Sequence, residues 1–151
     1  MTKYSFVPFA LPDIGEEEIS EVVDSLRSGW VTTGPKARRF EELFAKFLGD
    51  ADLYCVSVNS ATSGLHLALE ALGIESGDEV IVPAMSWIST SETVTQAGGR
   101  IVFCDVDPVT FCIDPSKVEQ LITRRTVGII PVHLYGHPAD MQALKRIADQ
   151  H

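Results

Sequence analysis

The fold class follows from the stretch LYCVSVNSATSGLHLALEALGIESGDEVIVP, residues 53–83. Two short apolar runs, 53–58 and 79–83, flank a segment whose apolar residues have helical spacing, 62–73. Short β-branched runs that are apolar throughout are typical of strands covered on both faces. The stretch therefore predicts a strand–helix–strand unit of an α/β fold.

The same alternation continues toward the C-terminus. Further strands are expected at 100–106 and 127–132, and further helices at 87–97, 115–123 and 138–150. Strand–helix alternation favours crossover connections and a mostly parallel sheet. Such sheets bind ligands at the carboxyl ends of their strands, so binding residues are expected in the loops that enter the helices.

Two amphipathic helices are predicted before this alternation begins. The first covers 16–28, with acids in its first turn, and the second covers 38–48. Between them the loop SGWVTTGP, residues 28–35, is marked by glycine and proline. One face of the second helix is expected to pack in the core through its apolar residues Phe40, Leu43, Phe44 and Phe47.

The composition favours a single folded domain of a cytoplasmic protein. The chain has 151 residues, of which 45% are hydrophobic, enough for a core without disulfides or metals. A net charge of −9 argues against nucleic acid as a partner. The sequence has no membrane-spanning apolar run and no recognisable signal peptide, so no membrane partner is expected. The spacing of the cysteines predicts reduced, mostly buried thiols at Cys55, Cys104 and Cys112.

The first strand-end loop, NSATSG at 59–64, is a candidate phosphate site. It opens a helix, where free N–H groups and the helix dipole attract anions. The hydroxyls of Thr62 and Ser63 could donate to a phosphate. Ordinary capping by Asn59 or Ser60 is the alternative interpretation. The loop matches neither a Walker sequence nor GxGxxG, which argues against nucleoside triphosphates and simple dinucleotides.

The next strand-end loop carries an aromatic residue, Trp87. A flat indole at this position could stack on a flat cofactor. Alternatively, the indole packs over the edge of the sheet.

A pair of carboxylates, Asp105 and Asp107, follows the strand expected at 100–106. With Pro108 next in the chain, this pair is interpreted as turn and cap chemistry. Asp114 and Pro115 similarly predict a cap and a first-turn proline for the following helix.

Two histidines follow the last predicted strand. His133 could face a substrate pocket, or it could be a hydrogen-bonded structural residue. His137 lies four residues further on, but Gly136 and Pro138 break any helix between them. The two rings therefore cannot share a helix face, and no metal site is predicted.

Taken together, these segments resemble the DegT/DnrJ/EryC1/StrS family of PLP-dependent nucleotide-sugar aminotransferases. The resemblance covers residues 8–150 and rests on motifs that occur in the family's order and spacing. The motifs are SGWVTTGPKARRFEELFAKFLG, VNSATSGLHLALEALGIESGDEVIVPAMSWISTSETV, the DVDP turn with its following IDP, and PVHLYGHPADMQAL. It implies the three-layer large domain of a fold-type-I PLP transferase, with a mostly parallel sheet that is incomplete in this chain.

The resemblance also implies roles for particular residues. The turn of Ala61, Thr62 and Ser63 matches the one that binds the phosphate of pyridoxal 5′-phosphate, and Trp87 matches the aromatic that stacks on the pyridine ring. On the substrate side of the pocket, the candidates are Thr32 and His133. The implied partners are a nucleotide-linked keto-sugar, an amino donor such as glutamate and a second copy of the chain in a homodimer.

The residues that carry the chemistry in this family are not expected in this chain. A carboxylate in a D-A-A-Q-type motif pairs with the pyridine nitrogen, and a lysine forms the Schiff base, both beyond the segment matched here. Residues 1–151 are therefore interpreted as the N-terminal part of the large domain, without the small C-terminal domain and with no catalytic residue. The chain alone is expected to be inactive. The alternatives are a fragment of a sugar 3-dehydratase of the same fold and a non-catalytic remnant with a binding role.

Overall fold

The computed structural model describes residues 8–50 and 52–151. Its internal contacts divide the chain after Ser57 into two units. We call the part up to Ser57 the N-terminal unit and Val58–His151 the C-terminal unit.

The C-terminal unit contains a three-stranded parallel sheet. Its order is β2-β1-β3, and Ile81 of the central strand pairs with Val102 on one side and Ile129 on the other. β1 has the predicted bounds, and the other two strands are shorter than predicted: β1 Glu79–Pro83, β2 Arg100–Cys104 and β3 Thr126–Ile129.

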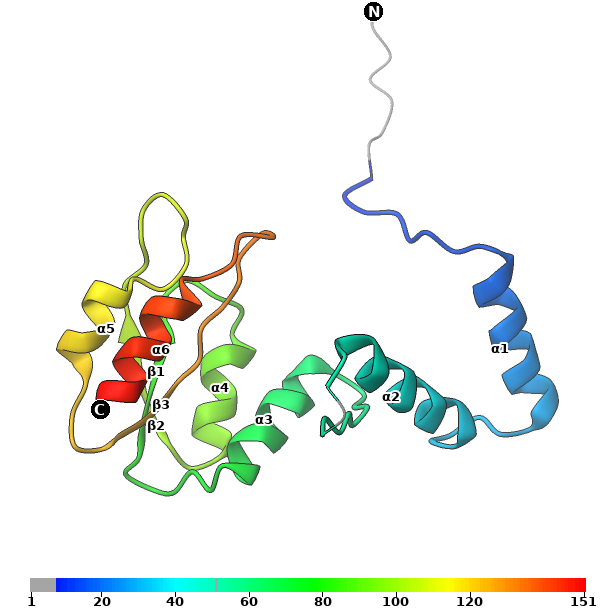
Figure 1. The fold of residues 1–151 in the computed structure, drawn as a ribbon, viewed down its shortest axis with the longest axis horizontal. Coiled ribbons are helices and arrows are strands. Elements are labelled where there is room, and N and C mark those ends of the chain that lie inside the picture. The colour runs from blue at the N-terminus through cyan, green and yellow to red at the C-terminus, as the bar shows by residue number, and fades with distance from the viewer. Residues whose placement is uncertain (1–7, 51) are drawn as a thin grey trace, which may run out of the picture. The chain divides into compact units, whose positions relative to one another are not determined.

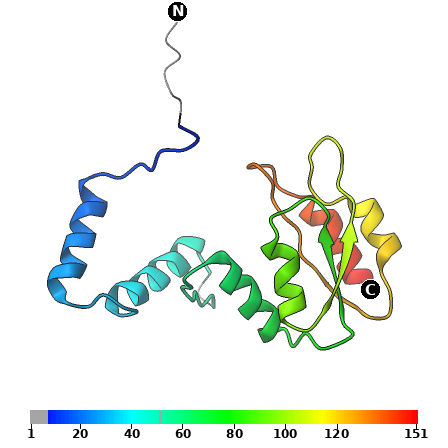
Figure 2. The same ribbon diagram turned by 180° about the vertical axis from the view of Figure 1, so that it is seen from behind.

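Helices cover both faces of this sheet, which makes three layers (Figures 1 and 2). All four predicted helices are confirmed with slightly different ends: α3 Ala61–Ala71, α4 Ser89–Gln96, α5 Pro115–Leu121 and α6 Met141–Gln150. The crossover from β1 to β2 runs through α4, and the crossover from β2 back to β3 runs through α5. Right-handed crossovers in opposite directions require their helices on opposite faces.

The side chains of β1 pack into a hydrophobic cluster on each face of the sheet. Every residue of β1 is buried, which confirms the prediction of a strand covered on both sides. Ile81 packs with residues of α5 and α6, including Val118 and Leu144. Val80 and Val82 pack with residues of α3 and α4 on the opposite face. The period of two along a strand thus divides its apolar residues between two hydrophobic clusters.

The connections of the sheet reverse direction at the carboxyl ends of β1 and β3. These strands are neighbours, yet the loop after β1 leads to α4 on one face and the loop after β3 leads to α6 on the other. Such a reversal opens a space between adjacent loops, where ligands bind in open α/β sheets.

The N-terminal unit has a different character. Its described residues form two helices, α1 Glu16–Ser28 and α2 Pro35–Leu48, and neither has a buried residue. Both end at a glycine in the left-handed conformation, Gly29 (φ 73°) and Gly49 (φ 76°). The expected core packing of the α2 face is therefore wrong for the described chain, because its apolar side chains are exposed: Phe40, Leu43, Phe44 and Phe47.

The strand expected at 53–58 is also wrong. These residues have no regular secondary structure, and the side chains of Tyr54 and Val56 are 93% and 78% exposed. A strand is stable only when its backbone groups pair with a neighbour. In the described residues the only sheet is the one in the C-terminal unit, and 53–58 is not among its strands.

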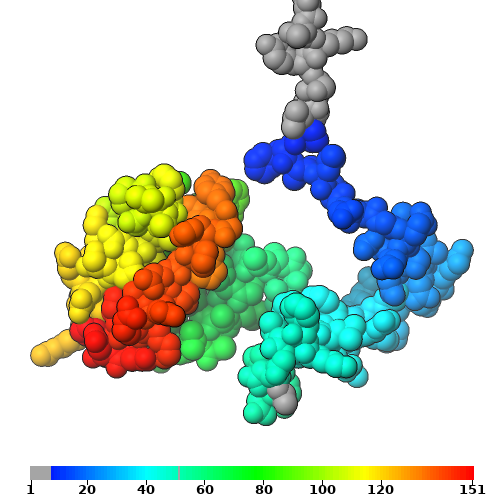
Figure 3. Space-filling view, turned by 45° about the horizontal axis from the view of Figure 1, so that its top comes forward, coloured from blue at the N-terminus to red at the C-terminus, as the bar shows by residue number. Residues whose placement is uncertain are grey.

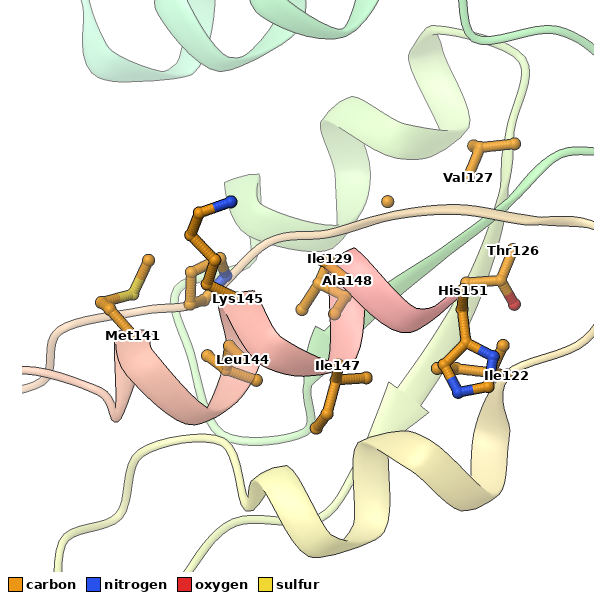
Figure 4. Close-up of a pocket in the computed structure, with 12 residues that line it drawn as sticks. Ile122, Thr126, Val127, Ile129, Met141, Leu144, Lys145, Ile147, Ala148 and His151 are labelled. Carbon is orange, nitrogen blue, oxygen red and sulfur yellow. The ribbon is translucent and has the colours of Figure 1, made fainter.

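A groove of about 450 Å³ runs between β3 and α6 (Figure 4). Its lining is mainly apolar and includes Ile122, Ile129, Leu144 and Ile147. None of the residues predicted to bind a cofactor or substrate lines it. No helix in the described residues is long and apolar enough to cross a membrane.

Candidate functional site

The start of α3 combines both interpretations of the NSATSG loop. Ser60 is the N-cap, and its hydroxyl accepts the N–H of Ser63 at 3.1 Å. The Ser63 hydroxyl in turn donates to Asn59 Oδ1 at 2.8 Å. Within the described chain, no acceptor is recorded for the N–H groups of Ala61 and Thr62. The capping prediction is confirmed, and the cap still leaves two N–H groups at the helix terminus for an anion.

A direct hydrogen bond joins this turn to the loop after β1. Thr62 Oγ1 lies 2.9 Å from Ser89 Oγ, and Ser89 is the first residue of α4. The sequence pattern gave no signal for Ser89, because an isolated serine at a helix start looks like ordinary capping. The bond brings the candidate phosphate turn to the carboxyl end of the central strand, as an α/β ligand site requires.

The indole of Trp87 lies two residues before Ser89, on the same loop. Its side chain is 77% exposed, so in the described chain it is not packed over the sheet edge. An exposed indole beside an anion-binding turn can offer its face to a planar ring. The structure thus brings the loops of Thr62, Ser63 and Trp87 together.

His133 follows β3, the strand next to β1. Its Nδ1 accepts the N–H of Ala139 at 3.0 Å, so the structural interpretation is supported by a defined partner. Because Nδ1 accepts, the neutral ring carries its hydrogen on Nε2, where it can donate to a ligand. Between His133 and Ala139 the chain makes a tight turn, in which Tyr135 (φ 50°) and Gly136 (φ 80°) have left-handed backbone conformations. This turn lies on the surface of the C-terminal unit, in the orange segment of Figure 3.

Thr32 belongs to the N-terminal unit and is exposed. Its loop is held by Trp30, whose Nε1–H donates to the carbonyl of Thr33 at 2.9 Å. The indole also covers Gly34, where any Cβ would overlap the ring. Gly34 is extended, so glycine is needed there for this close approach and not for a left-handed backbone. The sequence pattern indicated Gly34 only as a loop residue and gave no role to Trp30.

The carboxylates after β2 have structural partners, as predicted. Asp107 accepts the N–H groups of Val109 and Thr110 at 2.9 and 2.8 Å, and these bonds lower the pKa of its carboxyl group. Asp114 caps α5 by accepting the N–H of Ser116 at 3.0 Å. Both acids therefore order the backbone of their own turns.

Asp105 pairs with Lys117, which the sequence did not indicate. Lys117 Nζ lies 2.7 Å from Asp105 Oδ2, just beyond the carboxyl end of β2. The hydrogen bond with Asp105 raises the pKa of Lys117 and thus favours its ammonium form. An amine that acts as a nucleophile must lose this proton, so Lys117 is poorly suited to that role.

The three cysteines are unpaired, as predicted, with Cys104 and Cys112 buried and Cys55 half-buried. Burial raises the pKa of the Cys104 thiol and keeps it protonated.

The described residues therefore fit one class of ligand, a planar ring that carries a phosphate. N–H groups and hydroxyls at the start of α3 suit the phosphate, and an exposed indole suits the face of the ring. This combination at the carboxyl edge of a doubly wound sheet is typical of cofactor-binding α/β proteins.

Comparison with known proteins identifies the family. The model of the DegT/DnrJ/EryC1/StrS aminotransferase family matches residues 12–151. The chain belongs to this family, whose members depend on PLP, and it has the fold of type I PLP aminotransferases over the part that it covers.

Similar proteins support this assignment at high identity. Spore coat polysaccharide biosynthesis protein SpsC of Bacillus subtilis (strain 168) is 46% identical over 146 residues, which are 97% of this chain and 37% of SpsC. Spr1654 from Streptococcus pneumoniae, assigned as a sugar aminotransferase, has been solved in PLP and PMP forms. It is 42% identical with a TM-score of 0.89, over 95% of this chain and 36% of that one.

A third relative has a different reaction in its name. GDP-4-keto-6-deoxymannose-3-dehydratase is 31% identical with a TM-score of 0.87, over 95% of this chain and 38% of that one. This chain thus spans between a third and two fifths of the length of the relatives it matches.

Proposed function

We propose that this chain provides the phosphate- and ring-binding part of the PLP site of an aminotransferase that acts on nucleotide-linked keto-sugars. The observation that carries the proposal is the hydrogen bond between Thr62 and Ser89. It joins the anion-binding turn of α3 to the loop that carries Trp87, so that one ligand can contact both.

In this proposal the turn of Ala61, Thr62 and Ser63 holds the phosphate. The N–H groups of Ala61 and Thr62 and the Thr62 hydroxyl donate to it, and the Ser63 hydroxyl joins them when it turns away from Asn59 Oδ1. Trp87 covers one face of the ring and excludes water from it. On the substrate side, the Nε2–H of His133 donates to the substrate. Pyridoxal phosphate, when bound, supplies the electron sink for amino transfer, while the protein supplies orientation and electrostatics.

The higher identity to Spr1654 than to the dehydratase, 42% against 31%, favours amino transfer over dehydration. The dehydratase stays the second candidate, because it has the same fold over the same part of the chain.

We further propose that these 151 residues do not transfer amino groups by themselves. The lysines of the C-terminal unit are both ion-paired, Lys117 with Asp105 and Lys145 with Asp149 at 2.8 Å. The raised pKa of Lys117 opposes the attack of its amine on a cofactor aldehyde. The chain would then need residues supplied by further sequence or by a second chain.

Self-association is part of the proposal. The apolar faces of α1 and α2 are exposed in the described chain. Exposed apolar surface of this kind marks a site where a partner binds. A second copy of the chain, as in a homodimer, is the proposed partner.

The proposal is tested by mixing the purified chain with pyridoxal phosphate and reducing with borohydride. We expect saturable binding that competes with inorganic phosphate, and no single lysine labelled stoichiometrically when the peptides are mapped by mass spectrometry. Amino transfer from glutamate to a keto-sugar by this chain, together with stoichiometric labelling of one lysine, would show that it is a complete catalyst. Binding that phosphate does not displace would contradict the proposed cofactor site.

A further inference from the structure

Ser89 is the most buried hydroxyl at the candidate phosphate site. It is 8% exposed, and its Oγ lies 2.9 Å from Thr62 Oγ1. Its backbone carbonyl is engaged separately, since Thr93 Oγ1 donates to it at 2.8 Å. The Ser89 side chain therefore has a defined position and a single recorded side-chain partner in the described chain.

The direction of the bond between Thr62 and Ser89 is open without a ligand, because either hydroxyl can donate. A bound phosphate removes this freedom. Phosphate oxygens accept hydrogen bonds, so Thr62 must donate its one hydrogen to the phosphate. Thr62 Oγ1 is then an acceptor toward Ser89, and the Ser89 hydroxyl must be the donor of the pair.

From this we infer that Ser89 is a positioning residue of the phosphate site: its hydroxyl donates to Thr62 Oγ1 and turns the Thr62 hydrogen toward a phosphate oxygen. The inference rests on the proposed function and extends it to a residue that does not touch the ligand. Without Ser89 the Thr62 hydroxyl loses its fixed donor and rotates freely, so part of the phosphate hydrogen bond is lost.

The test compares two ligands that differ only in phosphate. Pyridoxamine 5′-phosphate and pyridoxamine lack an aldehyde and so cannot react with surface lysines. Binding is measured by calorimetry on the full chain, its Ser89→Ala and Thr62→Val variants, the double variant and a matched control, Ser91→Ala. Ser91 lies on the same helix, where its hydroxyl donates to the carbonyl of Ile88 at 3.0 Å.

We expect Ser89→Ala to weaken pyridoxamine 5′-phosphate binding about threefold to tenfold, the range for one hydrogen bond. Pyridoxamine binding should stay unchanged, as should both affinities in Ser91→Ala. In the Thr62→Val background, Ser89→Ala should have no further effect, because the hydroxyl that it positions is gone.

Two results would overturn the inference while leaving the proposed function intact. One is a Ser89→Ala chain that binds pyridoxamine 5′-phosphate as the unchanged chain does, although Thr62→Val binds it more weakly. The other is a Ser89→Ala effect that is equal for both ligands or undiminished in the Thr62→Val background, since either would mark a general packing role. If the unchanged chain binds both ligands equally, the phosphate site itself is wrong and the inference fails with it.

Discussion

Both units of this chain carry apolar residues in regular patterns, but only the C-terminal unit buries them. In the C-terminal unit, Val80, Ile81 and Val82 are at most 1% exposed and separate two hydrophobic clusters. In the N-terminal unit, the apolar faces of α1 and α2 stay open, and Phe47 is 83% exposed. Amphipathic periodicity therefore specifies a face, while burial requires a surface opposite that face.

This contrast has an energetic meaning. Burying apolar surface contributes about 25 cal/mol per Å², and only the C-terminal unit obtains much of that contribution within the described chain. The helices of the N-terminal unit depend more on local features, such as their left-handed glycine ends and the ion pairs of Lys36.

The largest expected effect separates the units directly. Ile81→Ala should lower the free energy of unfolding by about 2–5 kcal/mol, because it opens a cavity in a fully buried cluster. Phe47→Ala removes a larger side chain from an exposed position and should change it by less than about 0.5 kcal/mol. Urea unfolding monitored by circular dichroism measures both.

Equal losses of stability from the two substitutions would contradict this contrast between the units. If Phe47→Ala cost as much as Ile81→Ala at low protein concentration, the face of α2 would have to be buried in the monomer. If its cost appeared only at high concentration, a second copy would be covering that face.

A second prediction concerns a buried charge at the amino end of the sheet. The Glu79 side chain is fully buried, and it links β1 to the first residue of β2 and to the segment just before β3. It accepts from Thr123 Oγ1 at 2.7 Å and pairs with Arg100 at 2.5 Å and Arg125 at 2.8 Å. Glu79→Gln should destabilise the C-terminal unit, but less than Ile81→Ala, because the amide can keep the bond to Thr123.

This effect should depend on pH. The hydrogen bond from Thr123, followed by the one from Arg100, lowers the pKa of Glu79 below its ordinary value of 4.5. A lowered carboxyl pKa stabilises the fold above the ordinary value, and this contribution is lost as the pH falls through the lowered value. The difference between the chain and Glu79→Gln should therefore be constant near neutral pH and shrink in acid. A difference that grew in acid would show that Glu79 is protonated in the folded chain.

The sequence predicted the layered part of the fold well, for a physical reason. In the C-terminal unit, local pattern and tertiary environment agree: apolar strands are covered, and Asp114 and Ser60 cap the helices that they precede. The sequence pattern gave wrong predictions where burial depends on a neighbouring surface that the pattern does not show. The apolar run at 53–58 has no strand to pair with in the described chain, and the α2 face has no opposing surface there.

The site shows the same division. Thr62, Ser63 and Trp87 could be proposed from the sequence, because loop position and residue type are visible there. Ser89 and Glu79 were missed because their roles depend on contacts with residues 27 and 44 positions away in the sequence. The one signal available in the sequence was an acidic residue, Glu79, at the start of an apolar run, because an acid buried there needs a partner.

The smallest effect is expected in the N-terminal unit, where Lys36 connects the two helices. It donates to the backbone carbonyl of Glu21 at 2.8 Å and pairs with the side chains of Glu21 and Asp24. Exposed pairs of this kind are screened by salt and contribute little to stability. Lys36→Met should therefore reduce the hydrogen-exchange protection of α1 and α2 slightly and leave β1 unchanged. Lys46→Met on the same helix is the control, since no acidic partner of Lys46 is recorded among the described residues.

Salt and acid should reproduce the effect of Lys36→Met, which separates the ion pair from other roles of the side chain. High salt screens the pair, and the hydrogen bond from Lys36 lowers the pKa of Glu21, so the pair persists below the ordinary pKa of Glu21 and is lost only at lower pH. In Lys36→Met, the protection of α1 and α2 should no longer respond to salt. If the substitution instead reduced protection in β1 as much as in α1, the two units would unfold as one, and the contrast between them would describe burial alone and not stability.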